Sequence, residues 1–370
     1  MKILTVGSLP PPIDGQSLAF NIAVKSLSSK YIVKNVETNI FRGKGVISIF
    51  FLPLIYIFRI IYCRIIFKPD AIYFVCSRTV LGSLRDLFLL LLFRASPAFI
   101  VNHIHGSNLI EFIENLPLFY KKIFLIIYTR INKNVVLSSL MKNQLDDYEQ
   151  FKGKTLVINN FYEDIPDKIK IKDNKNLFNP FPLNLVYLSG ICSSKGVFDV
   201  IKASKYLSIK NVNHTLHIAG KGIDDEFLNA KEAESKVISL TQKSKEIKYL
   251  NLVTGVEKYN LLGKCHVFLL PSYYNSEAIP LSIIEAMRMG CVIITSNYKF
   301  LPSLVKHNVN GYIVQIKNVD EIVEAILDIY NNPSKFKRIS NFNKNYAMKN
   351  YSEESFKQNI IKLFSNDNSI

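Results

Sequence analysis

The chain of 370 residues contains no tryptophan, and its five cysteines form no C-x-x-C pair. An odd number of widely spaced cysteines argues against a disulfide framework and against a structural zinc site, and it fits a reducing cytosol. The N-terminal residues lack the basic and then apolar pattern of a secretory signal. No G-x-G-x-x-G fingerprint follows the first predicted strand, which disfavours a dinucleotide-dependent dehydrogenase.

Long uninterrupted apolar segments are also missing. The longest apolar stretch, Val46–Phe67, contains Pro53, Arg59 and Arg64. A membrane-spanning helix needs about 20 apolar residues, and each arginine inside it is costly, so we predict no transmembrane helix. Two interpretations remain: an interfacial helix whose arginines reach lipid headgroups, or a helix buried on both sides within an α/β layer.

Positive charge is what the chain has in excess, with a net charge of +16. Residues 1–135 contain 16 Lys and Arg against 6 Asp and Glu, so they carry +10 and the remaining residues carry +6. Such an excess suggests an anionic membrane, a phosphate-bearing substrate or nucleic acid as partner, and a generally basic proteome is the alternative. No RNA-binding signature or basic helix supports nucleic acid.

The length predicts two domains, because single domains rarely exceed about 250–300 residues. Short apolar runs alternate with helical patterns in both halves, which indicates βαβ units and parallel sheets. The predicted strands are Ile3–Gly7, Ile32–Glu37, Ala71–Val75, Ala98–Asn102, Asn134–Leu137 and Thr155–Ile158 in the first half, and Leu185–Ser189, Thr215–Ala219, Tyr249–Val253, Val267–Leu270, Val292–Thr295 and Tyr312–Val314 in the second.

Between the halves, Glu163–Pro182 is charged, contains three prolines and lacks an apolar stripe, so we interpret it as a linker. We predict an α/β protein with two Rossmann-like doubly wound domains, the first over residues 1–165 and the second over residues 183–350. A terminal helix in residues 351–370 is expected to return to the N-terminal domain. Such folds bind ligands in a cleft at the carboxyl ends of their strands.

The segment PSYYNSEAIPLSIIEAMRMG begins at the end of a predicted strand. Glu277 falls in the loop, and Pro280 suits the first turn of the following helix. Glu285 lies inside that helix among apolar residues, so its carboxylate needs a partner. A ribose diol would serve, because a carboxylate accepts hydrogen bonds from two hydroxyls, and pairing with Arg288 is the alternative.

Three predicted helix starts present N–H groups that suit a phosphate. The first includes Leu281 and Ser282. The second lies in LSGICSSKGVFDVIKA, where Lys195 adds a cation to the helix start. The third lies in LPPPIDGQS, where Gly15 opens a helix, and an ordinary strand-to-helix turn is its alternative explanation.

The segment VNHIHGSN follows another predicted strand and carries His103 and His105. These side chains face opposite sides if the strand continues through them. His105, directly before Gly106, is the better candidate to reach a ligand, with His103 in reserve, and a purely structural role is the alternative. A zinc site would need further ligands, which no Cys/His cluster supplies.

Together these segments resemble the retaining glycosyltransferases of family four, which have the GT-B fold of two Rossmann-like domains facing a central cleft. The resemblance extends over nearly the whole chain. It is strongest in the segment after Leu270, where the matching residues are Pro271, Ser272, Glu277, Pro280, Leu281, Glu285, Ala286, Met287 and Gly290. Two departures are Ile191, where the family has an arginine, and Asp14, where it has a second glycine.

The resemblance implies that Glu277 binds the donor sugar, that Glu285 binds the ribose and that Lys195 grips the donor phosphates. His105 would lie near the transferred sugar, so the implied catalytic residues are Glu277, His105 and Lys195. The implied donor-binding residues are Gly15, Gly190, Lys195, Gly220, Pro280, Leu281, Ser282 and Glu285. No D-x-D pair occurs, so we expect no metal and no other cofactor, with lysine and helix N-termini neutralising the leaving diphosphate.

The implied function is retaining transfer of a sugar from a nucleotide-sugar, UDP-linked as is frequent in the family. The implied acceptor is a glycan or a polyprenyl-diphosphate-linked glycan in bacterial surface polysaccharide synthesis, such as lipopolysaccharide or capsule. We expect a cytoplasmic protein without a nucleic acid partner, and peripheral binding to the anionic inner face of the cytoplasmic membrane stays open. The alternatives are a nucleotide-sugar epimerase on the same scaffold and a non-catalytic nucleotide-binding protein.

Overall fold

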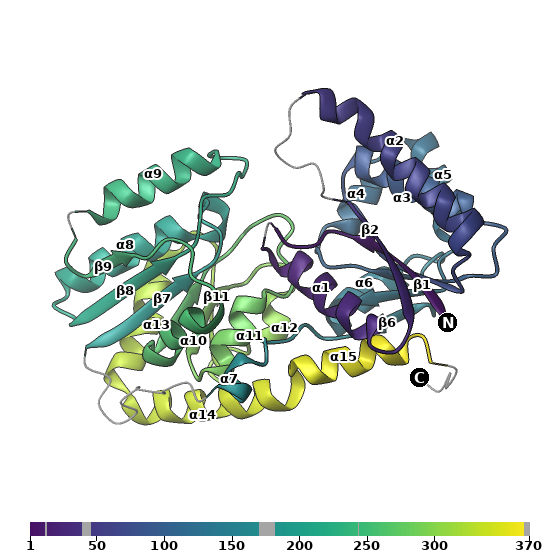
Figure 1. The fold of residues 1–370 in the computed structure, drawn as a ribbon. Coiled ribbons are helices and arrows are strands. Elements are labelled where there is room, and N and C mark those ends of the chain that lie inside the picture. The colour runs from purple at the N-terminus through teal and green to yellow at the C-terminus, as the bar shows by residue number, and fades with distance from the viewer. Residues whose placement is uncertain (12, 39–45, 170–181, 243, 366–370) are drawn as a thin grey trace. The chain divides into compact units, whose positions relative to one another are not determined.

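The computed structural model describes residues 1–11, 13–38, 46–169, 182–242 and 244–365, without the side chains of residues 46–53. The chain divides into two compact units (Figure 1). The first unit comprises Met1–Asn159 together with the residues from Glu354 onward, and the second comprises Asn160–Glu353. Each unit is an α/β domain, and each is described by itself below.

The first unit has a six-stranded parallel sheet with the strand order β2-β1-β3-β4-β5-β6. The strands are β1 (Lys2–Gly7), β2 (Ile32–Glu37), β3 (Ala71–Val75), β4 (Phe99–His103), β5 (Lys133–Val136) and β6 (Thr155–Val157). The helices are α1 (Gly15–Ser28), α2 (Val46–Tyr62), α3 (Val80–Leu92), α4 (Leu109–Glu114), α5 (Leu118–Tyr128), α6 (Ser139–Asp146) and α15 (Glu353–Lys362), and the π-helical turn η1 (Cys63–Phe67) follows α2.

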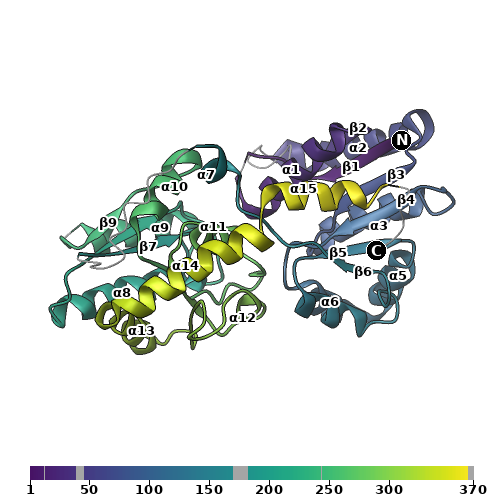
Figure 2. The same cartoon turned by 90° about the horizontal axis from the view of Figure 1, so that it is seen from below.

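Helices α1 and α15 cover one face of this sheet (Figure 2). The ring of Phe20 in α1 stacks on Tyr73 of β3, with the ring centroids 5.9 Å apart. Phe364, just after α15, makes edge contacts with Tyr73 and with Phe99 at 6.3 and 6.4 Å. Aromatic packing therefore attaches the end of the chain to the first sheet.

The second unit has a six-stranded parallel sheet with the order β12-β11-β10-β7-β8-β9. The strands are β7 (Leu183–Leu188), β8 (His214–Ala219), β9 (Ile247–Tyr249), β10 (Val267–Leu270), β11 (Val292–Ser296) and β12 (Gly311–Val314). The helices are α7 (Ile165–Lys168), α8 (Val197–Ile209), α9 (Ala230–Thr241), α10 (Gly255–Lys264), α11 (Leu281–Arg288), α12 (Leu301–Leu304), α13 (Val319–Asn331) and α14 (Pro333–Asn350), with the 3₁₀ turn η2 (Ser193–Lys195).

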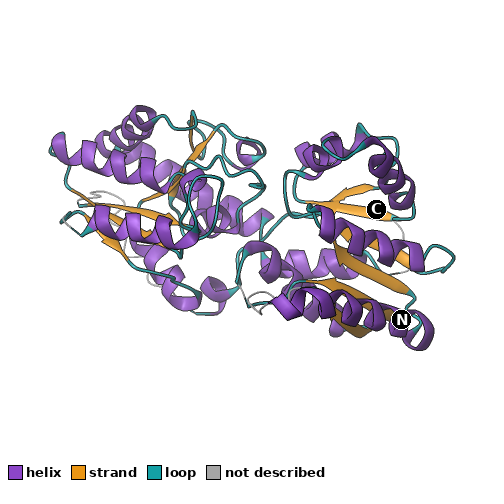
Figure 3. Ribbon diagram, turned by 90° about the horizontal axis from the view of Figure 1, so that it is seen from above, coloured by secondary structure: helices purple, strands orange, loops and turns teal. Residues whose placement is uncertain are grey.

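In both units the sheet lies between layers of helices (Figure 3). The strands β3, with the sequence AIYFV, and β10, with the sequence VFLL, are buried at every residue. Parallel strands covered on both faces consist of continuous apolar residues, which is why these strands were predictable from short apolar runs. The bounds of β2, β3 and β10 agree with the prediction, and the predicted α/β fold of two Rossmann-like domains is confirmed.

One predicted strand, Tyr249–Val253, is wrong. The structure has a shorter strand at Ile247–Tyr249 that ends where the prediction begins. Asn251 has a φ of 56°, in the left-handed region that a strand cannot contain. Its carbonyl accepts a hydrogen bond from the N–H of Gly220 at the end of the neighbouring strand, so these residues form a connecting loop.

The interpretation of Val46–Phe67 as a helix buried on both sides is also wrong. Tyr56, Ile60 and Cys63 are buried against the unit. The opposite side carries apolar residues with 40 to 69% exposure, namely Leu54, Ile55, Phe58, Tyr62, Ile65 and Ile66. Among the described residues, the structure has no helix with the length and apolar character needed to cross a bilayer.

The two units join at Asn159–Asn160, six residues before the predicted boundary at residue 165. Hydrogen bonds and an ion pair explain the difference. The N–H of Tyr162 donates to the carbonyl of Tyr351, and Glu163 pairs with Lys258. These contacts attach the start of the predicted linker to the second unit, whereas residues 170–181 of that linker lie outside the described residues. All five cysteines are buried thiols, and none forms a disulfide.

Candidate active site

The second unit brings together Lys195 and Glu277, two side chains separated by 82 residues of sequence. The Lys195 Nζ donates to the Glu277 Oε2 at 3.0 Å, and Ser272 Oγ donates to the same oxygen at 2.8 Å. The side chains of the ion pair are 14% and 7% exposed. Burial alone would lower the pKa of Lys195, but the Glu277 carboxylate outweighs it and raises that pKa, so the lysine carries its positive charge.

The backbone around Lys195 is fixed by a close approach of two loops. Gly196 has a φ of 77°, and a Cβ there would lie 2.5 Å from the carbonyl oxygen of Pro271. Tyr273 donates its N–H to the carbonyl of Ser194 at 2.6 Å. Only glycine tolerates both the left-handed conformation and this contact, so the residue after Lys195 must be a glycine for steric reasons.

Asp225 holds the same loop and was not identified from the sequence. Its carboxylate accepts hydrogen bonds from both the N–H and the Oγ of Ser194 at 2.8 Å, and from the N–H groups of Phe227 and Leu228. Burial acts to raise the pKa of Asp225, but these hydrogen bonds prevail and lower it, so the group stays ionised. The Asp224–Asp225 dipeptide after the Gly-Lys-Gly turn was the available signal.

Two helices begin beside the ion pair without a side-chain cap. Helix α8 starts directly after Gly196, and α11 starts at Leu281 after Pro280, and neither has a side-chain hydrogen bond at its N-cap. Pro280 is therefore the N-cap residue of α11, with Leu281 and Ser282 as its first helical residues. The first N–H groups of a helix have no acceptor within it, so this arrangement suits an anion.

Glu285 is buried at 3% exposure and has a cationic partner inside the protein. Lys258 of α10 donates to the Glu285 Oε1 at 2.7 Å and to Glu163 at 2.5 Å. Burial raises the pKa of Glu285, opposed by Lys258. The alternative pairing with Arg288 is wrong, because Arg288 contacts Asp167 instead. The partner that the buried Glu285 carboxylate was predicted to need is therefore present within the protein, and it is Lys258, which the sequence did not indicate.

Gly190 and Gly220 lie after the ends of the neighbouring strands β7 and β8. Gly220 has a φ of 154°, and a Cβ there would lie 1.9 Å from the carbonyl oxygen of Ser189. The carbonyl of Gly190 accepts a hydrogen bond from the Tyr187 hydroxyl at 2.7 Å. Next to Gly190, Ile191 is fully buried, so this position presents no polar side chain to a ligand.

The other predicted residues belong to the first unit. Gly15 is the first residue of α1, and the Asp14 carboxylate accepts a hydrogen bond from the N–H of Ser17 at 2.7 Å. This helix start, unlike those of α8 and α11, is therefore capped by its own chain. Asp14, which replaces the second glycine, leaves fewer N–H donors for a phosphate here.

The rings of His103 and His105 lie against each other, tilted by 32° and with their centroids 4.0 Å apart. The hydroxyl of Tyr73 and the Nδ1 of His103 are hydrogen-bonded at 2.6 Å. Burial, and then the positive charge of Arg78, lowers the pKa of His105 to about 3, so its ring is neutral near pH 7. A neutral imidazole can act as a hydrogen-bond donor or a proton acceptor but not as a cationic ligand for phosphate.

The described residues contain no group of three or more His, Cys, Asp or Glu side chains placed to hold a metal ion. The polar groups assembled in the second unit are one buried lysine–carboxylate pair, two helix N-termini and a second carboxylate held by Lys258. Such an arrangement can bind a phosphorylated ligand without a metal.

Comparison with known proteins identifies the fold. The structure of HepE from Anabaena in complex with UDP superimposes with a TM-score of 0.71 and 16% identity, covering 98% of this chain and 99% of that chain. The protein therefore has the GT-B fold of two Rossmann-like domains. Residues 168–346 match the family model described as glycosyl transferases group 1.

Two curated relatives are similar to part of the chain. Identity to AmsK, the amylovoran biosynthesis glycosyltransferase of Erwinia amylovora, is 24% over 166 residues, which are 44% of this chain and 39% of that protein. Identity to the UDP-Gal:alpha-D-GlcNAc-diphosphoundecaprenol alpha-1,3-galactosyltransferase of Escherichia coli is 33% over 70 residues, 19% of this chain and 18% of that protein. The chain thus spans less than half the length of the curated relatives it matches.

Replacing Lys258 with methionine should destabilise the protein. The substitution leaves Glu285 and Glu163 without their cation, and breaking a buried ion pair costs about 3–5 kcal/mol. Urea unfolding should report this loss as a lower midpoint. Lys264→Met, in the last turn of the same helix but exposed, is the matched control and should change stability by less than about 0.5 kcal/mol. Equal stability of the two variants would contradict the role of the network.

Proposed function

We propose that the protein transfers a sugar from a nucleotide-sugar, UDP-linked, to a glycan or lipid-linked acceptor with retention at the anomeric carbon. The observation that carries this proposal is the buried Lys195–Glu277 pair beside the uncapped starts of α8 and α11. All of these elements lie within the residues that match the glycosyltransferase family model. The UDP complex of the structurally similar HepE supports a UDP-linked donor.

The chemical step breaks the bond between the anomeric carbon and a diphosphate oxygen, and the electron pair stays on the diphosphate. The acceptor hydroxyl forms the new bond to the anomeric carbon, and its proton passes to the leaving diphosphate. Negative charge therefore develops where Lys195 and the N–H groups of the two helix starts converge. Preorganised donors at such a position stabilise the transition state more than the ground state.

The two glutamates have different roles in this proposal. Glu277 holds Lys195 in place before the donor arrives and accepts hydrogen bonds from the hydroxyls of the bound sugar. Glu285 uses one oxygen for Lys258, and a carboxylate accepts several hydrogen bonds, so the group can also bind the ribose hydroxyls. The diphosphate is neutralised by Lys195 and helix N-termini, without a metal or other cofactor.

A lipid-diphosphate-linked glycan in surface polysaccharide assembly is the proposed acceptor. Two relatives support this choice: one acts in amylovoran biosynthesis, and one transfers galactose to a sugar on diphosphoundecaprenol. The epimerase and non-catalytic alternatives lack comparable support. A lipid-linked acceptor also requires the enzyme to work at a membrane surface.

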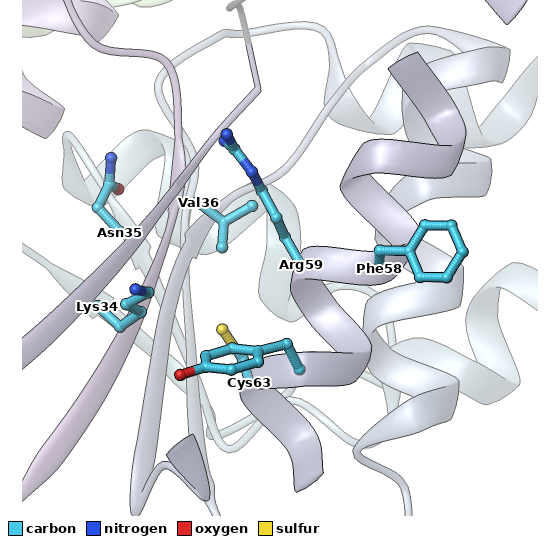
Figure 4. A pocket seen from close by; sticks show the side chains of 7 residues that line it. Lys34, Asn35, Val36, Phe58, Arg59 and Cys63 are labelled. Atoms are coloured by element: carbon cyan, nitrogen blue, oxygen red, sulfur yellow. The ribbon is translucent and has the colours of Figure 1, made fainter. Parts of the chain in front are cut away.

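The face of α2 and η1 suits peripheral binding to an anionic membrane, which we include in the proposal. Leu54, Phe58 and Tyr62 recur every four residues on one side of the helix, and they are 50, 69 and 49% exposed. Beside them, a hollow between β2 and α2 is lined by Lys34, Asn35, Val36, Phe58, Arg59, Tyr62 and Cys63 (Figure 4).

The charges of this hollow complement lipid headgroups. The Lys34 ammonium lies 5.6 Å from the Tyr62 ring centroid. Within the described part of the chain, neither Lys34 nor Arg59 forms an ion pair, so both cations are open to an anionic headgroup. Apolar side chains would enter the acyl boundary while these cations contact phosphates.

Lys195→Ala should lower turnover while changing the donor KM much less. Loss of one preorganised donor to a developing charge costs roughly 10²–10³ in kcat. Lys205→Ala, an exposed position on the adjoining helix α8, is the control and should keep wild-type turnover. Steady-state kinetics with a UDP-sugar donor measure both parameters. Near-wild-type kcat in Lys195→Ala would rule out the assigned role.

The protein should sediment with anionic phospholipid vesicles at low salt, and high salt should release it because the Debye length falls to about 3 Å at 1 M. The double variant Phe58→Ser/Arg59→Gln should bind at least tenfold more weakly. Ile209→Ser/Lys210→Gln, an apolar and basic pair in the second unit with Ile209 76% exposed, is the matched control. Absence of vesicle binding by the wild-type protein at low salt would refute the membrane proposal.

A further inference from the structure

One arginine in the first unit has no partner for its charge among the residues that the structure describes. Arg78 follows β3, and among the described residues it forms neither a hydrogen bond nor an ion pair, while its Nη1 is buried. The neighbouring carboxylate of α3, Asp86, is already engaged, because it pairs with Arg85 at 2.7 Å and accepts the N–H of Ser77 at 2.6 Å. A half-buried guanidinium without an anion is costly, which indicates a missing ligand.

The guanidinium lies against the loop that follows β4. A Cβ on Gly106 would come within 2.3 Å of the Arg78 Cζ, so the side chain rests directly on this glycine. Strands β3 and β4 are neighbours in the sheet, with Val75 opposite His103. Arg78 and the histidine pair therefore meet at the carboxyl ends of two adjacent parallel strands, where α/β folds bind ligands.

The histidines add unsatisfied nitrogens to this place. The Nε2 atoms of His103 and His105 are buried and have no hydrogen-bond partner in the described structure. His105 is only 9% exposed, and a buried nitrogen without a partner costs about 1–3 kcal/mol. An ordered water could satisfy one nitrogen, but it could not neutralise the arginine. An anion that accepts several hydrogen bonds can do both.

We infer that Arg78 and His105 form a subsite that binds a phosphate or diphosphate group in the first unit. The Arg78 guanidinium supplies positive charge and several N–H donors in one plane. The neutral imidazole of His105 supplies one further N–H donor. That this group belongs to a substrate rests on the proposed sugar transfer. It comes either from the diphosphate of a lipid-linked acceptor or from that of the nucleotide-sugar.

Binding is tested on the whole 370-residue chain by NMR: the His105 resonance, assigned with the His105→Gln variant, is followed during titration with inorganic pyrophosphate. In Arg78→Gln, the affinity for pyrophosphate obtained from this titration should fall on the order of tenfold to a hundredfold, which corresponds to the loss of a charge-assisted hydrogen bond. Arg94→Gln removes an exposed charge from the same unit and should bind like the wild type. The same affinity in Arg78→Gln and wild type would overturn the subsite.

A second variant separates a binding role from a structural one. Gly106→Ala keeps every charge but displaces the guanidinium, so it should also weaken pyrophosphate binding. Because Arg78 makes no hydrogen bond or ion pair with the described part of the chain, the Arg78→Gln variant should unfold at the wild-type temperature. A large drop in that temperature together with unchanged pyrophosphate binding would mean that Arg78 is structural and would overturn the inference.

Kinetics then assign the source of the phosphate. In Arg78→Gln, a raised KM for an alkyl-diphosphate-linked sugar acceptor with an unchanged donor KM assigns the subsite to the acceptor. A raised donor KM with weaker binding of UDP assigns it to the nucleotide-sugar. If no donor and acceptor react at all, the proposed sugar transfer fails, and the pyrophosphate titration still tests the subsite by itself.

Discussion

The buried ion pair between Lys195 and Glu277 is the interaction on which the second unit's candidate site depends. Each charge would be costly at this depth without the other, so the two loops that carry them must meet. The backbone allows the two loops to come close, because only a glycine at position 196 leaves room for the carbonyl oxygen of Pro271. The N–H of Tyr273 also donates a hydrogen bond to the carbonyl of Ser194. The pair holds a cation beside two helix starts, and in the proposed function the diphosphate of the donor takes over part of the role of Glu277.

A second carboxylate–lysine group stabilises the surroundings of this site. Lys258 links Glu285 of α11 to Glu163 of the segment that enters the second unit. Glu285 is thereby fixed inside an apolar helix, and the segment after Asn159 is attached to the same unit. In the first unit the opposite condition holds: Arg78 and His105 have unsatisfied nitrogens at the ends of β3 and β4. The first unit therefore contains buried polar atoms without partners among the described residues, whereas the buried charges of Lys258 and Glu285 are paired.

The sequence allowed the fold and the separate site segments to be predicted, because buried parallel strands and strand-to-helix turns leave local patterns. The strands β2, β3 and β10 have the predicted bounds for that reason. Pairing across the fold has no local pattern. The sequence therefore could not indicate that Lys195 contacts Glu277 or that Lys258 neutralises Glu285, and the Asp224–Asp225 dipeptide marked a polar turn without showing that Asp225 holds the loop at Ser194. The left-handed Asn251, which ends β9 early, is likewise a single-residue property that an apolar run conceals.

Transfer of the sugar itself tests the central claim most directly. The purified protein is offered a panel of isotope-labelled nucleotide-sugars together with a lipid-diphosphate-linked glycan, and the product is analysed by NMR. We expect one UDP-sugar to give a lengthened acceptor whose new linkage keeps the anomeric configuration of the donor. An inverted linkage would contradict the retaining mechanism. Conversion of the donor into an epimer without any transfer to the acceptor would contradict the proposed activity as a whole.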